Sequence, residues 1–228
     1  MRGFHNRGEA GRILARDLQA AIGSNTADAP YILVLGLPRG GVPVAFEVAR
    51  GLAAELDVFL VRKLGVPGEQ ELALGAIASG GVRVLNRELI EHLHLSSDLV
   101  DRVTAVERRE LERREQLYRE GRPCVPVKGR TVVLVDDGLA TGASIMAAIR
   151  ALRPQDPLRI IVAVPVATKH TCGELEKEVD QLVCLAAPQT LGAVGLWYED
   201  FRQVSDDEVR KLLDEAAHAR KAKAAGFA

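Results

Sequence analysis

Two adjacent carboxylates, Asp136 and Asp137, stand between an apolar run and a glycine-rich loop. The apolar run, 132–135, is typical of a central parallel strand that is covered on both faces, and we expect it to end at Asp136. Open α/β sheets bind their ligands in the crevice outside the carboxyl ends of such strands. The sequence therefore predicts that the two acids face hydroxyl groups of a bound ligand.

The loop after the two acids has the composition of a phosphate-binding site. Its glycines permit close approach of the backbone, and its N–H groups can surround a dianionic phosphate at the N-terminus of a helix that begins near Ala143. Phosphate in this loop, with hydroxyl groups facing the acids, describes a ribose 5-phosphate. The residues assigned to the phosphate, among which Thr141 and Ser144 add hydroxyl donors, are Gly138, Leu139, Ala140, Thr141, Gly142, Ala143 and Ser144.

The thirteen residues 132–144, VVLVDDGLATGAS, resemble the phosphoribosyl-pyrophosphate (PRPP) binding signature of the type I phosphoribosyltransferases. That signature is a hydrophobic quartet, two acids and a Gly/Thr-rich loop, and it is matched without a gap. Other phosphate motifs do not fit, because the loop lacks the Gly-Lys-Ser/Thr ending of a P-loop and the chain has no G-x-G-x-x-G fingerprint. An ordinary strand with an acidic turn is the weaker alternative. A motif alone indicates binding and does not prove catalysis.

A second strand–loop–helix unit precedes the first one. Its strand, 31–35, leads into Gly36-Leu-Pro-Arg-Gly-Gly41, which resembles the pyrophosphate loop of the family. Gly40 and Gly41 can direct backbone N–H groups at a pyrophosphate, while Arg39 adds a charge-assisted contact. A turn with a solvated arginine is the alternative. The position of this loop, one βα unit from a second phosphate loop, favours the pyrophosphate assignment.

A third apolar strand is expected at 57–61, ending in Arg62 and Lys63. Two cations at a strand end in the crevice can neutralise pyrophosphate charge, and Lys63 is the better candidate of the two. A solvated strand edge is the alternative. The next segment, 65–81, alternates in a strand-like way between glycine-rich ends and predicts a hairpin. The resemblance implies that this hairpin is the mobile flap of the family, which closes over PRPP, and a rigid edge hairpin is the alternative.

The chain holds its only Trp, one Tyr and one Phe within five positions, 197–201. They lie in 188–204, a segment without strand or helix periodicity. The cluster can fasten the last loop to the core, which is the more frequent role of such residues. The resemblance implies instead that 188–204, with the C-terminal helix, forms a small hood, and that Trp197 or Tyr198 stacks on a nucleobase.

Composition and element order define the expected class. The 228 residues carry a formal net charge of −1 and three cysteines without metal or redox spacing, and no signal peptide or membrane span is visible. We expect a cytoplasmic protein that does not bind nucleic acid or membranes. Repeated βα units predict an α/β fold of one domain, 1–228: a doubly wound, mainly parallel sheet with helices on both faces, type I phosphoribosyltransferase-like, with flap and hood.

The resemblance implies an enzyme of nucleotide metabolism that moves a 5-phosphoribosyl group from PRPP to a nitrogen nucleophile, a nucleobase, and releases pyrophosphate. Its catalytic residues would be Asp136 and Asp137, which hold ribose hydroxyls or Mg²⁺, directly or through water, with Arg39 and Lys63 on the pyrophosphate. No general base is assigned, and a homodimer is one option. The alternative is a regulatory module that senses PRPP and binds nucleic acid or protein, for which the arginine-rich helix 107–116 is the only support.

Overall fold

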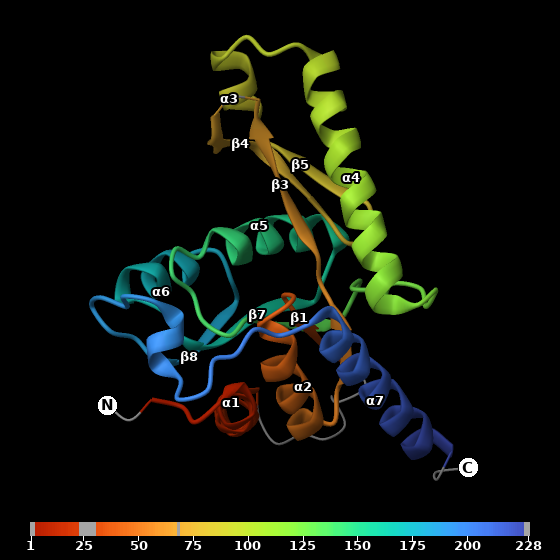
Figure 1. The fold of residues 1–228 in the computed structure, drawn as a ribbon, viewed down its shortest axis with the longest axis vertical. Coiled ribbons are helices and arrows are strands. Elements are labelled where there is room, and N and C mark those ends of the chain that lie inside the picture. The colour runs from red at the N-terminus through yellow and green to blue at the C-terminus, as the bar shows by residue number, and fades with distance from the viewer. Residues whose placement is uncertain (1–2, 23–30, 68, 226–228) are drawn as a thin grey trace.

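The computed structural model describes residues 3–22, 31–67 and 69–225. These residues form a five-stranded sheet in the order β2-β1-β6-β7-β8, in which every neighbouring pair is parallel. Figure 1 shows this sheet in the lower half of the molecule, with helices on both sides of it. The strands are β1 Ile32–Gly36, β2 Glu55–Val58, β6 Thr131–Val135, β7 Arg159–Val166 and β8 Gln181–Ala186.

The two faces of the sheet are covered by different helices, because successive side chains of a strand point to opposite faces. On one face, Val34 and Val133 pack with apolar side chains of α1 (Arg7–Ile22) and α2 (Gly41–Leu52). On the other, Leu134 packs with α5 (Ala143–Leu152) and α6 (Lys169–Leu175). This arrangement confirms the predicted doubly wound, mainly parallel α/β fold.

The direction of winding reverses between β1 and β6, the two central neighbours. From β1 the chain passes through α2 to β2, and from β6 it passes through α5 to β7 on the opposite side. The last residues of the two strands, Gly36 and Val135, pair directly. Because ligands of open α/β sheets bind where the strand order reverses, we expect the ligand crevice beyond Gly36 and Val135.

A second, antiparallel sheet rises from the first one, as the upper half of Figure 1 shows. It contains β3 Val61–Val66, β4 Glu69–Ala78 and β5 Val82–Leu85, and it leads into α3 Arg87–His92 and the long α4 Ser97–Arg119. Its apolar face packs against α4, which packs in turn against α7 (Asp206–Ala225). Two short 3-10 helices, η2 Arg153–Gln155 and η3 Val194–Trp197, complete the described elements.

The predicted third strand, 57–61, and the placement of Arg62 and Lys63 at its end were wrong in detail. The third core strand ends at Val58, because its partner β1 ends at Gly36, and the chain leaves the sheet there through the buried Phe59 and Leu60. Arg62 and Lys63 therefore lie within β3 and not at the end of a core strand. The predicted hairpin 65–81 covers the end of β3, all of β4 and the turn to β5, and Gly68 lies outside the described residues.

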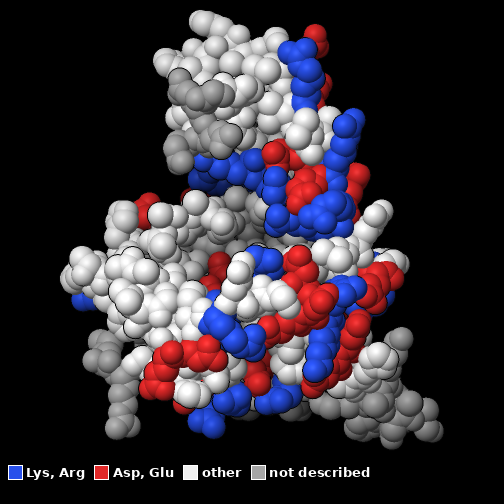
Figure 2. Space-filling view, in the orientation of Figure 1, with Lys and Arg blue, Asp and Glu red and all other residues white. Residues whose placement is uncertain are grey.

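The arginine-rich part of α4 carries ion pairs of alternating charge. Arg113 and Arg114 both donate to Glu110 within the helix, and Arg62 of β3 donates to Glu107. Figure 2 shows Lys/Arg and Asp/Glu side chains intermingled on this part of the visible face. Such alternation is typical of a solvated helix with intrahelical pairs.

The C-terminus of α4 is anchored to β2 by a buried ion pair. Arg119 Nε lies 3.1 Å from Asp57 Oδ1, and the two side chains are only 6% and 7% exposed. Arg119 also donates to the carbonyl of Val58 at 2.9 Å, and Asp57 accepts from the backbone N–H of Val125. A charge in this position needs its partner, because water does not replace it.

We predict that Asp57→Ala lowers the free energy of unfolding by about 3 kcal/mol, measured by urea denaturation. The loss is expected near the lower end of the range for broken buried pairs, because Glu115 still lies 2.7 Å from Arg119. Lys128→Ala is the control, since Lys128 belongs to a surface pair and is 81% exposed. An equally small effect of both substitutions would contradict the anchoring role of Asp57.

Candidate functional site

The loops after β1 and β6 meet at the switch point and touch each other. The backbone N–H of Leu37 donates to the carbonyl of Val135 at 2.9 Å. A Cβ at Gly41 would lie 2.8 Å from that same carbonyl oxygen, and a Cβ at Gly40 would overlap the carboxylate of Asp137. Only glycine therefore fits at these two positions, and the predicted pyrophosphate loop is packed directly onto the acid pair.

The two carboxylates at the end of β6 share a partly buried position. Burial raises the pKa of Asp136 well above its ordinary value of 3.8, and the charge of Asp137 raises it further. Burial also raises the pKa of Asp137, whereas the hydrogen bond and charge of Arg7 act in the opposite direction. Internal hydrogen bonds engage Oδ1 of Asp136, which accepts from the backbone of Asp137, and Oδ2 of Asp137, which accepts from Arg7.

The predicted phosphate loop divides into an anchored part and an exposed part. Leu139 is buried, and its N–H donates to the carbonyl of Val166 at 2.8 Å, which fixes the loop to β7. Gly142 has a φ of +72° at the N-cap of α5. Thr141 and Ser144 are exposed around this helix N-terminus, together with Ala140 and Ala143. Their hydroxyls and the first N–H groups of α5 are therefore accessible to an anion.

Arg39 follows a cis peptide bond after Pro38 and points toward the last helix. Its Nη1 lies 3.8 Å from Oδ1 of Asp206, at the start of α7. The same Asp206 oxygen accepts a 2.6 Å hydrogen bond from the hydroxyl of Tyr118 on α4. The arginine of the predicted pyrophosphate loop thus contacts the start of α7, at the oxygen that Tyr118 of α4 also contacts.

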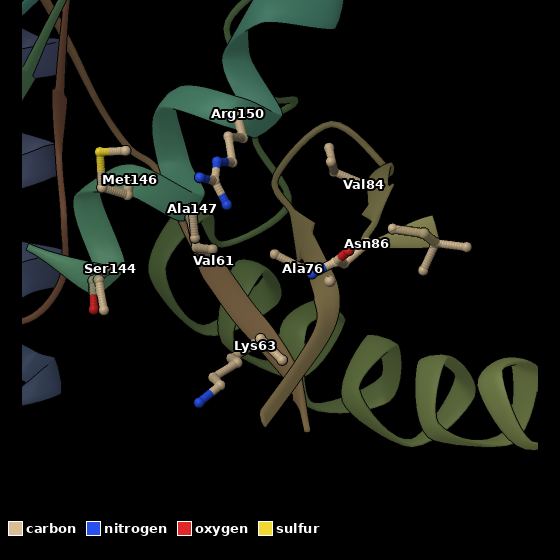
Figure 3. Close-up of a pocket in the computed structure, with 13 residues that line it drawn as sticks. Val61, Lys63, Ala76, Val84, Asn86, Ser144, Met146, Ala147 and Arg150 are labelled. Atoms are coloured by element: carbon tan, nitrogen blue, oxygen red, sulfur yellow. The ribbon is translucent and has the colours of Figure 1, made fainter. Parts of the chain in front are cut away.

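A cavity of about 670 Å³ lies between α5 and the antiparallel sheet. Figure 3 shows Lys63 of β3 and Ser144 of α5 on the same side of this cavity, with Arg150 of α5 reaching into it farther along the helix. Its walls are mainly apolar, with Val61, Val84 and other small side chains. The structure therefore brings Lys63 to the helix of the phosphate loop, although by a hairpin and not by a core strand.

Tyr198, predicted to stack on a base, lies inside an aromatic cluster. Its ring centroid is 5.5 Å from that of Phe4 and 5.0 Å from that of Phe201, and its hydroxyl donates to the carbonyl of Asp137 at 2.6 Å. Burial raises the pKa of its hydroxyl, so it remains a neutral donor. Trp197 is partly buried and donates from Nε1 to the carbonyl of Leu191 at 3.3 Å.

Arg7 is a site residue that the sequence did not reveal. Its Nε donates to Oδ2 of Asp137 at 2.8 Å and its Nη1 to the carbonyl of Arg202 at 2.8 Å. The available signal was its position as the first residue of α1, where a cation opposes the helix dipole. Such a placement is unfavourable for the helix itself and points to a partner elsewhere.

The fold and the arrangement of these residues define a doubly wound α/β protein with a candidate ligand site at the switch point. Residues 7–190 match the family model described as "Phosphoribosyl transferase domain". The chain belongs to this family, which confirms the resemblance drawn from the sequence. Within the described residues, no helix has the length and apolar character needed to cross a membrane, and no group of three or more His, Cys, Asp or Glu residues could hold a metal ion.

Two relatives illustrate the similarity. A Mycobacterium tuberculosis protein named "Putative phosphoribosyl transferase" is 46% identical over 216 residues, which are 95% of this chain and 47% of that protein. The chain thus spans about half the length of the curated relatives that it matches. The crystal structure of TT1426 from Thermus thermophilus is similar with 45% identity and a TM-score of 0.83, over 94% of this chain and 99% of the other.

We predict that Gly40→Ala lowers the free energy of unfolding by about 1–3 kcal/mol, because the added methyl group forces Asp137 or the loop to move. Urea denaturation measures the change. Gly173→Ala is the matched control, since a Cβ at Gly173 in α6 meets nothing within 4 Å. The contact between the two loops would be refuted if Gly40→Ala were as harmless as the control.

We also predict that Asp136→Asn raises the thermal unfolding temperature in the absence of divalent cations, and more so as the pH rises from 4 to 8. A group whose pKa is raised by folding favours the folded state only while it is protonated. That contribution is lost as the pH rises above 3.8 and through the raised pKa of Asp136 in the folded state, whereas asparagine does not titrate. If the rise in unfolding temperature, measured in EDTA, did not increase with pH, the charged carboxylate of Asp136 would not be destabilising the folded state.

Proposed function

We propose that the chain transfers a 5-phosphoribosyl group from PRPP to a nitrogen nucleophile, a nucleobase in the first instance, with release of pyrophosphate. The observation that carries the proposal is the meeting of three chemically different parts at one switch point. These parts are the acid pair, the exposed hydroxyl-bearing loop 140–144, and the Gly40-Gly41 backbone packed on Asp137. Together they match the hydroxyls, the 5-phosphate and the pyrophosphate of PRPP.

The 5-phosphate is assigned to the N-terminus of α5. The first N–H groups of this helix lack intrahelical partners, and the helix dipole favours an anion there. The side chain of Leu139 is buried and its N–H donates to Val166, so this residue anchors the loop and leaves the phosphate to its neighbours. Thr141 and Ser144 are exposed next to the N-cap Gly142 and supply hydroxyl donors.

The ribose hydroxyls are assigned to Asp136 and Asp137. One oxygen of each carboxylate is held by the internal hydrogen bonds described above, which leaves the other oxygen of each for the ligand. The donor set also fits Mg²⁺, since this ion is typically bound through one or two carboxylates, several waters and substrate phosphates. When bound, Mg²⁺ would offset the charge of the leaving pyrophosphate as a Lewis acid.

The pyrophosphate is assigned to the loop after β1 and to the facing hairpin. Gly40 and Gly41 have no side chains to obstruct an anion. Arg39 of the same loop and Lys63, which lines the cavity beside α5, are assigned as its cations. As the bond to pyrophosphate breaks, negative charge grows on the leaving group. Fixed cations stabilise that charge without having to reorganise.

The acceptor must reach the ribose carbon while water is excluded. We assign water exclusion to the hairpin of β3 and β4, which lies over the cavity beside α5. The acceptor side is assigned to the hood 188–204. There Trp197 is the better of the two predicted base contacts, because the ring of Tyr198 packs between Phe4 and Phe201.

Free thiols at all three cysteines support the expected cytoplasmic setting.

The proposal is tested by incubating the protein with PRPP, Mg²⁺ and a panel of purine and pyrimidine bases, and by measuring pyrophosphate. We expect base-dependent release in the wild type. We expect Asp136→Asn with Asp137→Asn to weaken Mg-PRPP binding at least about tenfold by calorimetry, because charge-assisted hydrogen bonds are lost. Asp17→Asn, an exposed acid on α1, is the matched control.

The outcomes separate the enzyme from its alternative. Unchanged PRPP affinity in the double variant, with an unchanged circular dichroism spectrum, would remove the acids from the PRPP site. PRPP binding without release of pyrophosphate for any base, joined to salt-sensitive retention of nucleic acid, would instead support the regulatory module.

A further inference from the structure

Arg7 is buried in a place that brings no benefit to its own helix. It is the first residue of α1, where the dipole disfavours a cation, and its side chain is only 11% exposed. A guanidinium group withdrawn from water must recover its hydration by hydrogen bonds and by a nearby negative charge. Its neighbours therefore indicate why the residue is there.

Those neighbours come from two parts of the chain that are distant from Arg7 in sequence. The carboxylate of Asp137, 130 residues away, accepts from Nε, and the carbonyl of Arg202 accepts from Nη1, each at 2.8 Å. The flat face of the guanidinium lies over Phe201, with Cζ 3.8 Å from the ring centroid. Arginine can satisfy all three contacts at once, because its planar fork donates in two directions and stacks through its face.

The N-terminal arm, residues 3–6, is itself joined to the hood. Phe4 donates from its N–H to the carbonyl of Trp197 at 2.7 Å and accepts from Glu199 at 2.9 Å, in the manner of an added parallel strand. The next residue, His5, accepts from the N–H of Asp200. The arm and the hood thus form one unit. Arg7 directly follows the arm and contacts Phe201 and Arg202 of the hood, so this unit fixes its position.

This unit holds Asp137 at two points. The hydroxyl of Tyr198 donates to the main-chain carbonyl of Asp137, and Arg7 donates to its side-chain Oδ2. The rotation of the carboxylate is therefore set from outside β6 and its loop. With Oδ2 engaged by Arg7, Oδ1 is the oxygen left for a ligand.

We propose that Arg7 is a positioning residue for the phosphoribosyl donor: it fixes the orientation of the Asp137 carboxylate, so that Oδ1 meets the ribose hydroxyls or their hydrated Mg²⁺. The inference rests on the proposed function, because it needs PRPP at the acid pair. It also makes productive PRPP binding depend on the docking of the arm and the hood. Charge alone does not suffice, since a lysine ammonium group lacks the fork and the stacking face.

The test measures the affinity for Mg-PRPP by calorimetry in the full chain. We expect Arg7→Gln and Arg7→Lys to lose about tenfold or more, the size expected for a charge-assisted hydrogen bond. Arg12→Gln is the matched control, because Arg12 lies on the same helix, is 50% exposed and pairs with Glu47 at the surface. It should bind PRPP like the wild type.

A double-mutant cycle separates positioning from general damage to the fold. If Arg7 acts through Asp137, Arg7→Gln combined with Asp137→Asn should bind PRPP no more weakly than Asp137→Asn alone. Guanidinium ion, added to Arg7→Ala at concentrations too low to unfold the protein, should restore part of the affinity. A purely structural role would not show this rescue.

Each outcome bears on one proposal or on both. Wild type that fails to bind PRPP would overturn the proposed function and this inference with it. Wild type that binds PRPP, with Arg7→Gln and Arg7→Lys binding equally well, would overturn the role of Arg7 alone. Additive losses in the cycle would also overturn it, since they show that Arg7 does not act through Asp137. If Arg7→Gln does not fold, Arg7→Lys and the rescued Arg7→Ala give the same decision.

Discussion

The burial of two adjacent carboxylates at the end of β6 is the constraint on which the rest of the site depends. Like charges withdrawn from water destabilise each other, and the raised pKa of Asp136 reflects this. The structure offsets the penalty only in part, through Arg7 on Asp137 and a backbone N–H on Asp136. The two carboxylates therefore still attract a cation or hydroxyl donors, which a ligand can supply. The folded state is less stable at this position because its residues are suited to bind a ligand.

Rigid packing keeps this costly arrangement in place. All five residues of β6 are buried between α1 and α2 on one face and α5 and α6 on the other, so the strand end cannot withdraw from the crevice. The loop after β1 adds a steric limit, because Gly40 lies directly against the carboxylate of Asp137. The acid pair is thus supported by the core behind β6 and by the backbone of the loop after β1, which contacts it from the side.

More distant elements reach the site through a few polar contacts. The buried pair of Arg119 and Asp57 fastens α4 to β2, and Asp206 at the start of α7 contacts both Tyr118 and Arg39. The antiparallel sheet packs against α4 and faces α5 across the cavity that Lys63 lines. The placement of the hairpin and the last helix is therefore linked to both sides of the proposed pyrophosphate position.

The sequence alone determined the parts of this protein that depend on neighbours in the chain. A continuous apolar run made 132–135 a recognisable strand, the loop 138–144 carried its phosphate chemistry in consecutive residues, and repeated βα units defined the doubly wound sheet. Tertiary structure alone decided which distant residues join them. Arg7 meets Asp137 across 130 positions, Lys63 reaches the cavity beside α5 from a hairpin, and the ring of Tyr198 packs between Phe4 and Phe201. No periodicity announces such contacts, because each depends on how whole elements dock and not on the local preference of the backbone.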